Sequence, residues 1–282
     1  MAKYKPTGAL KRFVDVGKKD TRVLGSIERH LLAKPRDRSR RTDVLHPSEM
    51  AGSDWCYRAS YFQLLGKEPQ EGRKASFRLL SIFEEGHQIH AKWQKWLTDM
   101  DVLYGKWYAP GIDEYFFGGS DVYEGTLEYC EVPLFYAPLR ISGHSDGWIV
   151  GLGDPMMLEI KSIGVGTLRY ECLDLFMDND ADFDKTWKAI NAPFLKHITQ
   201  VQIYMKLAEL LGLPNAPQEA VLIYEAKPNQ EVKEFVIPKS DFGITELFDA
   251  AQMICDAVKN KVPPACNIGP QGCAKCKGYT ND

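Results

Sequence analysis

The stretch that most constrains this chain runs from Arg140 to Ile163 and has the pattern of two short strands joined by a turn. Apolar and β-branched residues flank a Gly-Leu-Gly-Asp-Pro turn at 151–155. Asp146 and Glu159 lie at about equal distances before and after the middle of that turn. Opposed side chains on one face of a hairpin have Cβ atoms roughly 5 Å apart. The two carboxylates are therefore expected to face each other and to bind one Mg²⁺ or Mn²⁺ ion.

Lys161 lies two residues beyond Glu159, so the alternation of a strand places its ammonium group on the same face. Ile160, between them, is expected to point into the core. An exposed hairpin with ordinary surface charges is the alternative interpretation. The Gly-His-Ser-Asp-Gly sequence at 143–147, placed opposite Glu-Ile-Lys, favours the metal site.

The length and composition predict one α/β domain with insertions or terminal additions. The chain has 282 residues, of which 44% are hydrophobic and 26% are charged, as in ordinary soluble proteins. Because no apolar run approaches the roughly 18 residues that span a bilayer, and the start of the chain is basic without an apolar core, we expect a cytoplasmic protein.

The charge is distributed unevenly along the chain. Residues 1–42 contain 13 Lys and Arg against 4 Asp and Glu, whereas the whole chain has a net charge of −3. A basic arm over 1–42 on an acidic domain over 43–282 suits a polyanionic partner. A solvated, partly disordered tail is the alternative for the arm.

Two helices are predicted in the first half of the chain. One follows Trp55 and ends near Gly66, with Cys56 close to its start. The other spans about 75–98 and should bury one face, because a stripe of residues recurs at spacings of three and four: Leu79, Phe83, Gly86, His90, Trp93 and Leu97. A histidine on such a stripe is either a hydrogen-bonded core residue or a metal ligand.

The second half is predicted to mix strands and helices. Strands are expected over 127–136, 220–226 and 232–237, and helices over 192–211 and 241–259. We expect an irregular stretch after the hairpin, with the acidic run 178–184 as a solvated insertion.

The helix predicted over 192–211 places His197, Gln200 and Tyr204 on one side. These polar groups need partners when the helix packs on the sheet, and the acidic hairpin and its lysine would supply them. A surface glutamine beside a core tyrosine is the alternative.

Four of the seven cysteines indicate a metal centre. Without a secretory signal, disulfides are not expected. Cys266, Cys273 and Cys276 form a C-x6-C-x2-C pattern among Gly and Pro, and Cys56 is the candidate fourth ligand of a tetrahedral thiolate site. Free thiols without a metal are the alternative. The remaining cysteines are expected to act as small buried hydrophobic residues.

Taken together, these pieces resemble the RecB-like branch of the PD-(D/E)XK nucleases, and most closely its iron-sulfur members, such as the CRISPR-associated adaptation nucleases, AddB-type nuclease domains and phage exonucleases. The resemblance covers about 47–276 and rests on motifs found in this order: Cys-x-Arg (Cys56, Arg58), Gly-x3-His (Gly86, His90), Gly-x2-Asp (Gly143, Asp146), Glu-x-Lys (Glu159, Lys161), Gln-x3-Tyr (Gln200, Tyr204) and the three late cysteines. The late cysteines depart from the pattern of the adaptation nucleases, in which the C-x2-C pair is expected first.

This resemblance implies a restriction-endonuclease-like α/β core, with a central mixed sheet flanked by helices and a cysteine clasp between its early and late segments. It also implies a metal-dependent DNA exonuclease of phage or bacterial recombination, repair or processing. Because no helicase motifs and no P-loop accompany these motifs, we expect a stand-alone enzyme. DNA is the expected substrate, and a recombination or single-strand-annealing protein is the further partner that it suggests. A nuclease-fold binding module without activity and a structure- or site-specific endonuclease are the alternatives.

The resemblance further implies a role for each site residue. The metal ligands would be His90, Asp146, Glu159 and the carbonyl of Ile160. Lys161 would orient or deprotonate the attacking water, while Gln200 and Tyr204 would position Lys161 and the DNA backbone. The four cysteines, Cys56, Cys266, Cys273 and Cys276, would bind a 4Fe-4S cluster, with structural Zn²⁺ as the alternative.

Overall fold

The computed structural model describes residues 22–34, 41–69, 76–213 and 216–279, and the chain divides into two compact units. The first unit comprises 1–40 and 73–85. Its described elements are helix α2 (Arg22–Ala33) and the start of helix α5 (Phe77–Asp99). Most of the predicted basic arm lies outside the described residues, and its boundary at residue 42 stays a prediction.

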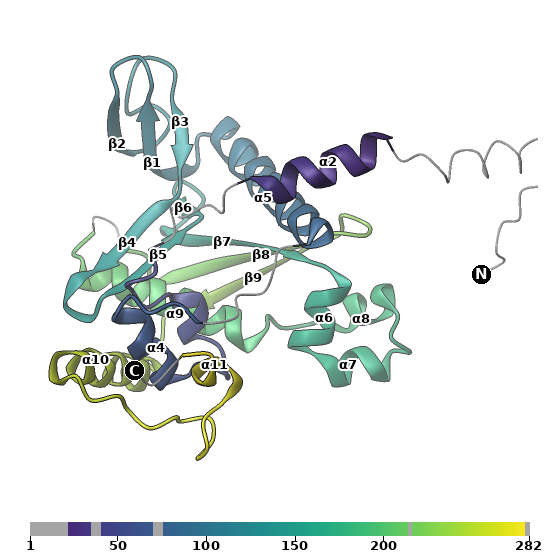
Figure 1. The fold of residues 1–282 in the computed structure, drawn as a ribbon. Helices are drawn as coiled ribbons and strands as arrows, with labels where there is room; N and C mark the ends of the chain where they lie inside the picture. Colours follow the sequence, from purple (N-terminus) through teal and green to yellow (C-terminus); the bar gives the residue numbers. More distant parts are fainter. Residues whose placement is uncertain (1–21, 35–40, 70–75, 214–215, 280–282) are drawn as a thin grey trace, which may run out of the picture. The chain divides into compact units, whose positions relative to one another are not determined.

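The second unit, 41–72 with 86–282, is built on a central mixed sheet (Figure 1). The strand order is β2-β1-β6-β7-β8-β9, with β3 also paired to β1. β7 and β8 run parallel, and the other pairs are antiparallel. The bounds are β1 (Leu103–Ala109), β2 (Glu114–Gly118), β3 (Glu128–Cys130), β6 (Gly147–Ile149), β7 (Met156–Ile163), β8 (Glu219–Ala226) and β9 (Val232–Pro238). β4 (Val132–Tyr136) and β5 (Ile141–Ser145) form a separate antiparallel pair.

Helices cover both faces of the sheet, so the predicted α/β class with a central mixed sheet flanked by helices is confirmed. On one face, residues of α4 (Tyr57–Leu64), α9 (Leu195–Leu210) and α10 (Ile244–Asn260) join the sheet in a large apolar core. On the other face, Ile89 and Leu97 of α5 pack on Leu158 and Ile160 of β7. Figure 1 shows α4, α9 and α10 on the same side of β7 and β8.

The alternation of β7 explains how this strand serves both faces. Leu158 and Ile160 belong to the α5 side, whereas Met157 and Ile163 belong to the core that contains α9. Glu159 and Lys161 therefore project toward α9, in agreement with the period of two in a strand. Ile160 is fully buried, as its place in the pattern predicts.

Helix termini follow local sequence signals. Cys56 is the N-cap of α4, and its thiol accepts a hydrogen bond from the Ala59 N–H. Gly66, just beyond the end of α4, has a φ of 73°, which favours glycine because it has no Cβ. The helix predicted after Trp55 is thus confirmed, and its start fixes the position of Cys56.

The stretch after β7 is helical, so the prediction of an irregular segment is wrong. It forms α6 (Val165–Glu171), α7 (Leu173–Asp178) and α8 (Phe183–Ala189). Leu168, Phe176 and Trp187 are buried in the core, and these widely spaced apolar residues gave too short a pattern for a periodic signal. The acids of the run 178–184 are exposed, and Asp182 caps α8 through the Lys185 N–H.

Two further features of the fold differ from what the sequence pattern predicted. The sequence pattern missed β1 and β2, whose aromatic residues pair across the strands, as in the contact between Tyr108 and Tyr115. The stripe along α5 is not buried along its whole length: Phe83 is 54% exposed, whereas Leu97 is 8% exposed. Apolar spacing predicted the helix correctly but not the degree of burial along it.

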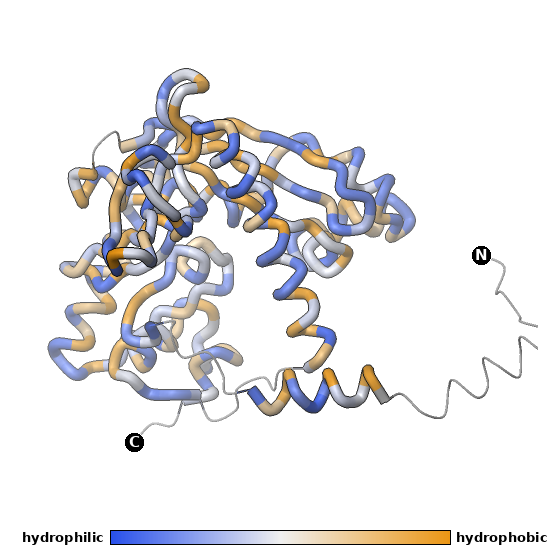
Figure 2. The backbone as a smooth tube through the Cα atoms, turned by 90° about the horizontal axis from the view of Figure 1, so that it is seen from above, coloured by the Kyte–Doolittle hydropathy of each residue, from blue (hydrophilic) through white to orange (hydrophobic). Residues whose placement is uncertain are grey.

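None of the described helices combines the length and the apolar character needed to cross a membrane. Along the tube in Figure 2, hydrophobic and hydrophilic residues alternate over short distances. This alternation is typical of elements that have one face in a core and the other in water.

Candidate active site

The hairpin predicted over 141–163 forms in part: β6 and β7 pair across the turn, whereas 141–145 form β5, which pairs with β4 instead. β6 pairs antiparallel with β7, with Gly147 opposite Leu158 and Ile149 opposite Met156. Asp146 immediately precedes Gly147, and Glu159 immediately follows Leu158. The register therefore places the two acids opposite each other at the same level of the hairpin. The turn at 151–155 therefore sets the spacing of the candidate site.

Asp146 links the hairpin to helix α5. Its Oδ1 is 2.9 Å from Nδ1 of His90, and its Oδ2 accepts a hydrogen bond of 2.6 Å from the backbone N–H of Ile160. Its carbonyl accepts hydrogen bonds from the hydroxyl of Tyr129 and the side-chain amide of Gln94. Asp146 is 4% exposed, and these contacts fix the position of its side chain.

Glu159 belongs to a second group of contacts, on the α9 side. Its Oε1 is 2.5 Å from Nζ of Lys161 and accepts a hydrogen bond of 2.9 Å from Nε2 of Gln200. The same Nε2 is 3.0 Å from the hydroxyl of Tyr204, and Lys161 donates to Oε1 of Gln200 at 3.3 Å. The structure thus brings together Glu159, Lys161, Gln200 and Tyr204, the residues that the Glu-x-Lys and Gln-x3-Tyr patterns singled out.

The other oxygen of Glu159 distinguishes this site from an ordinary salt bridge. Within the described chain, Oε2 is buried and has no hydrogen-bond partner. A buried carboxylate oxygen without a partner costs about 1–3 kcal/mol in lost solvation. A hard cation supplies the positive charge that such an oxygen lacks, so the donor set fits Mg²⁺ or Mn²⁺.

The ionisable groups of the site influence one another strongly. Burial raises the pKa of Glu159 to about 7, and although Lys161 opposes this rise, the charge of Asp146 adds to it. Burial lowers the pKa of Lys161, but the adjacent Glu159 outweighs that effect, so its pKa is raised. The charge of Asp146 thus opposes ionisation of Glu159, while Lys161 stays protonated.

Glu131, which no sequence pattern singled out, lies beside His90 and Asp146. Ligand atoms of His90, Glu131 and Asp146 all lie within 4.8 Å of one another, a spacing that one metal ion can bridge. Desolvation and the neighbouring Asp146 raise the pKa of Glu131. Glu131 sits between β3 and β4, 15 residues before Asp146, and no motif or periodic pattern in the sequence marks it.

The predicted ligands are therefore only partly gathered into one group. His90 and Asp146 belong to the group with Glu131, whereas Glu159 contacts Lys161 and Gln200 and lies outside it. Ile160 contributes its N–H to Asp146. Binding of a metal by the Ile160 carbonyl stays a prediction.

His197, on the same side of α9 as Gln200, has a different environment. Its Nδ1 is 2.6 Å from the hydroxyl of Tyr224, which also accepts a hydrogen bond from the Phe194 N–H. Burial, with the charges of Lys161 and Lys196, lowers the pKa of His197 to about 3. His197 is therefore a neutral core residue that supports the sheet beneath the site.

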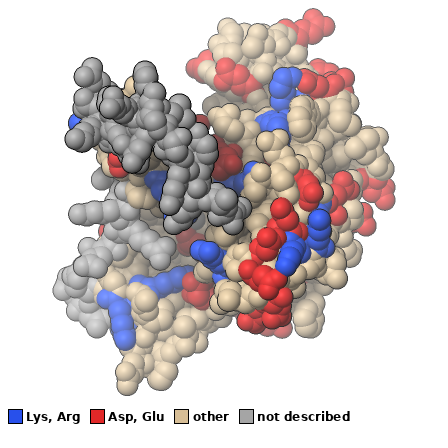
Figure 3. Space-filling view, turned by 90° about the vertical axis from the view of Figure 1, so that its right-hand side faces the viewer, with Lys and Arg blue, Asp and Glu red and all other residues tan. Residues whose placement is uncertain are grey.

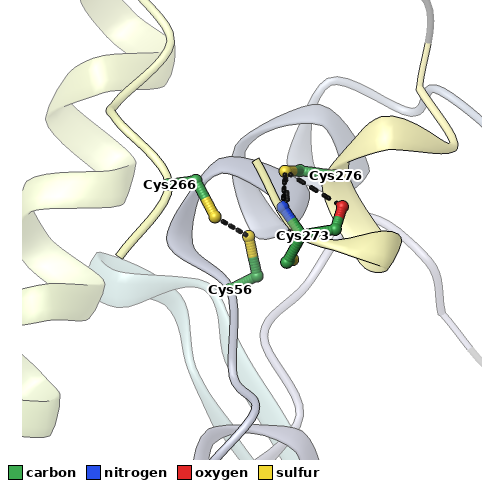
Figure 4. Close-up of side chains that lie close together, drawn as sticks. All are labelled: Cys56, Cys266, Cys273 and Cys276. Carbon is green, nitrogen blue, oxygen red and sulfur yellow. Dashed lines mark hydrogen bonds between the residues drawn. The ribbon is translucent and has the colours of Figure 1, made fainter. Parts of the chain in front are cut away.

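The four cysteines singled out by the sequence converge at a second place (Figure 4). Cys56 comes from the start of α4, Cys266 from the loop after α10, and Cys273 and Cys276 from the start of α11 (Ala274–Lys277). The Sγ atoms of Cys56 and Cys266 are 3.8 Å apart, although 210 residues separate them. The cysteine clasp between early and late segments is thus confirmed as an arrangement of free thiols that can bind a metal.

The other three cysteines differ in how far they are buried. Cys255 is buried and donates to the Leu139 carbonyl, which agrees with its expected role as a small core residue. Cys130 and Cys172 are only partly buried, and Cys172 packs against the large apolar core, so for these two the expected burial is met in part.

Charges on the surface are mixed. On the face drawn in Figure 3, groups of acidic side chains lie beside fewer basic ones. This distribution agrees with the acidic balance that the sequence gives residues 43–282.

Comparison with known proteins gives only distant likenesses. No protein-family model matches the sequence, and no curated protein matches it. Among solved structures, the alkaline exonuclease LHK-Exo from Laribacter hongkongensis aligns with a TM-score of 0.42 at 14% identity, covering 78% of this chain and 90% of the exonuclease. Its complex with dAMP gives a TM-score of 0.44 at 12% identity, with the same coverage.

A structure named SSO0001 aligns with a TM-score of 0.37 at 14% identity, covering 88% of this chain and 87% of that one. These scores and identities are low, so the likeness by itself assigns neither an activity nor a family.

Proposed function

We propose that this chain is a divalent-metal-dependent deoxyribonuclease of the PD-(D/E)XK type that degrades DNA from an end. The observation that carries the proposal is the Glu159 carboxylate. It is buried at the hairpin with one oxygen bonded to Lys161 and Gln200 and the other without a partner. A carboxylate held in this way, at the level of Asp146, is suited to binding a cation and to little else.

The proposed roles follow from the contacts. His90, Asp146 and Glu131 form the group that can bind a metal from the α5 side, and Glu159 presents its free oxygen from the α9 side. When bound, Mg²⁺ or Mn²⁺ would polarise a phosphodiester and lower the pKa of a water molecule. Lys161, fixed by Glu159 and Gln200, would orient the water and stabilise charge that develops on the phosphate.

Gln200 and Tyr204 are positioning residues in this proposal. Gln200 contacts Glu159, Lys161 and Tyr204 simultaneously, so it holds the acid and the lysine in a fixed relation. Its loss would loosen Lys161 without removing a charge from the site. Sites in which catalytic groups are held by such secondary contacts lose activity when the supporting residue is removed.

DNA is the proposed substrate, and the cellular role would be recombination, repair or processing of phage or bacterial DNA, with a recombination or single-strand-annealing protein as a further partner. The resemblance in motif order supports this role. The cysteine centre would act as a metal-held clasp between the start and the end of the second unit, for which the resemblance predicts a 4Fe-4S cluster and zinc is the alternative.

The test compares variants on linear duplex DNA with Mn²⁺. Glu159→Gln keeps the size of the side chain but removes its charge, so cleavage should fall by at least about 100-fold. Asp154→Asn makes the same acid-to-amide change at an exposed position in the turn of the same hairpin, and it should cleave normally.

Circular dichroism and thermal unfolding of both variants show whether the fold is retained. Near-normal cleavage by folded Glu159→Gln would reject the active-site assignment. DNA binding by the wild-type chain without cleavage under any Mn²⁺ or Mg²⁺ condition would leave a binding module as the function instead.

A further inference from the structure

The four cysteine sulfurs lie closer together than a site for a large cluster requires. Every pair of Sγ atoms among Cys56, Cys266, Cys273 and Cys276 is within 4.8 Å. The Cys56–Cys266 pair is 3.8 Å apart, and the Cys273–Cys276 pair is 3.9 Å apart. Figure 4 shows the sulfurs of Cys56 and Cys266 facing each other, with Cys273 and Cys276 beside them.

Two of these pairs have the spacing of ligands around one tetrahedral ion. Zn–S bonds are about 2.3 Å long, and a tetrahedron with such bonds has sulfur–sulfur edges of about 3.8 Å. A 4Fe-4S cluster attaches each thiolate to a different iron, with every bond pointing away from the centre of the cluster. Its thiolates must therefore be separated by an iron–iron distance in addition to the span of a single ion.

The residues around the four thiols pack directly against them. Cys56 is 1% exposed and Cys276 is 5% exposed, and the four cysteines pack with Ala59 and Tyr279. A cavity of about 440 Å³ borders this place, but among the four cysteines only Cys266 and Cys276 line it. Because Cys56 and Cys273 do not border the cavity, a cluster placed in it would require these two thiols to move.

Backbone N–H groups already point at the thiols. The Ala59 N–H donates to Sγ of Cys56 at 3.5 Å, and the Cys273 N–H donates to Sγ of Cys276 at 3.2 Å. Such hydrogen bonds stabilise negative charge on sulfur, which a thiolate ligand needs. The site is thus arranged for thiolates at the separations found in the structure, without a rearrangement of the chain.

We propose that Cys56, Cys266, Cys273 and Cys276 bind a single tetrahedral Zn²⁺ ion, in place of the 4Fe-4S cluster that the resemblance implies. The site has four protein ligands and no open position, which is typical of structural zinc. Zinc has no redox chemistry, so the clasp would respond to chelation but not to oxidation or reduction of the metal. The proposal rests on the thiol geometry and does not depend on the proposed nuclease activity.

The first test measures metal in the full chain, expressed in medium that contains both iron and zinc and purified without oxygen. Inductively coupled plasma mass spectrometry should find about one zinc per chain and almost no iron, and the protein should be colourless. Brown protein with about four irons per chain would overturn the proposal. Protein without either metal, and without the ability to take up zinc, would overturn it as well.

Metal replacement gives a second readout that does not depend on how the protein was expressed. Unfolded, metal-free chain is refolded anaerobically in Co²⁺, which should produce the intense visible absorption of tetrahedral cobalt–thiolate sites and saturate at about one ion per chain. Added Zn²⁺ should abolish that absorption. Absence of the cobalt–thiolate absorption in Co²⁺ alone, or saturation at a stoichiometry other than about one ion per chain, would contradict the inference.

Matched serine variants localise the site. Cys266→Ser and Cys172→Ser change cysteines that are both partly buried, but only the first belongs to the group of four. Cys266→Ser should lose most of its zinc and the cobalt absorption, and Cys172→Ser should keep both. Full zinc content in Cys266→Ser, or its loss in Cys172→Ser, would refute the assignment. If Cys266→Ser does not fold, the cobalt stoichiometry of the wild-type chain decides the question.

Discussion

His197 should make the stability of this protein fall as the solution becomes acidic. Its imidazole is 7% exposed, lies against the hydroxyl of Tyr224 and has its pKa lowered from 6.5 to about 3, first by burial and then by the nearby lysines. Between these two pKa values the unfolded chain binds a proton that the folded chain rejects. Stability from His197 is therefore complete above pH 6.5 and is lost as the pH falls toward 3.

The size of the effect follows from the two pKa values. Each unit of pH below 6.5 costs about 1.4 kcal/mol, so lowering the pH from 7 to 5 should reduce the free energy of unfolding by about 2 kcal/mol through this residue. For a chain of this length that corresponds to a fall in Tm of about 4 °C. His197→Asn removes the titrating group while placing an amide where Nδ1 lies, so this part of the pH dependence should disappear.

The assay is urea unfolding of the wild-type chain and the variant at pH 7 and pH 5, followed by circular dichroism. Other groups also titrate in this range, so the quantity of interest is the difference in pH dependence between the two proteins. His87→Asn, which makes the same change at an exposed histidine of α5, serves as the control for the substitution itself. Equal pH dependence in wild-type and His197→Asn protein would refute the assignment of His197 as a buried neutral group.

Three other predictions follow from particular contacts. Glu131→Gln should raise the Mn²⁺ concentration needed for half-maximal cleavage by roughly 10-fold or more, measured by activity against Mn²⁺ concentration, because Glu131 belongs to the group with His90 and Asp146. Lys92→Met should lower the free energy of unfolding in urea by about 1–3 kcal/mol, because it removes the ion pair of the buried Glu225 carboxylate, which keeps its hydrogen bond from Trp93; an unchanged free energy of unfolding would show that this pair is not needed. Deleting residues 1–42 should flatten the dependence of DNA affinity on salt, by about 0.9 in the log–log slope for each lost contact with duplex DNA, and an unchanged slope would mean that the arm does not contact DNA.

The sequence predicted the hairpin and its polar partners because their spacing is short-range. The turn at 151–155 determines which residues of β6 and β7 are opposite one another, and the helical period places Gln200 and Tyr204 on one side of α9. Once α9 packs on β7, these periods are sufficient to bring Gln200 to Glu159. The cysteine clasp was predictable for a chemical reason, since four thiols outside a disulfide pattern indicate a metal.

Other features depended on contacts that no local pattern encodes. Glu131 reaches the site because β4 pairs with β5, and this pairing places the start of β4 beside Asp146. The burial of Leu97 depends on its packing against Leu158 and Ile160 of β7, a tertiary contact that helical spacing does not reveal. The helices after β7 are short and bury one or two large residues each, so their apolar positions are too few to define a period.

The most direct measurement of the proposed activity is digestion of DNA with different ends. Linear duplex labelled at the 5′ end, linear duplex labelled at the 3′ end and closed circular duplex are incubated in parallel with the full chain, with Mn²⁺ or with a chelator. A metal-dependent enzyme that degrades DNA from an end should reduce both linear substrates to short products in Mn²⁺. It should leave the circle intact, and the chelator should stop all cleavage. Cutting of the circle at the rate of the linear DNA would contradict degradation from an end, and cleavage that persists in the chelator would contradict the proposed role of Asp146 and Glu159 in metal binding.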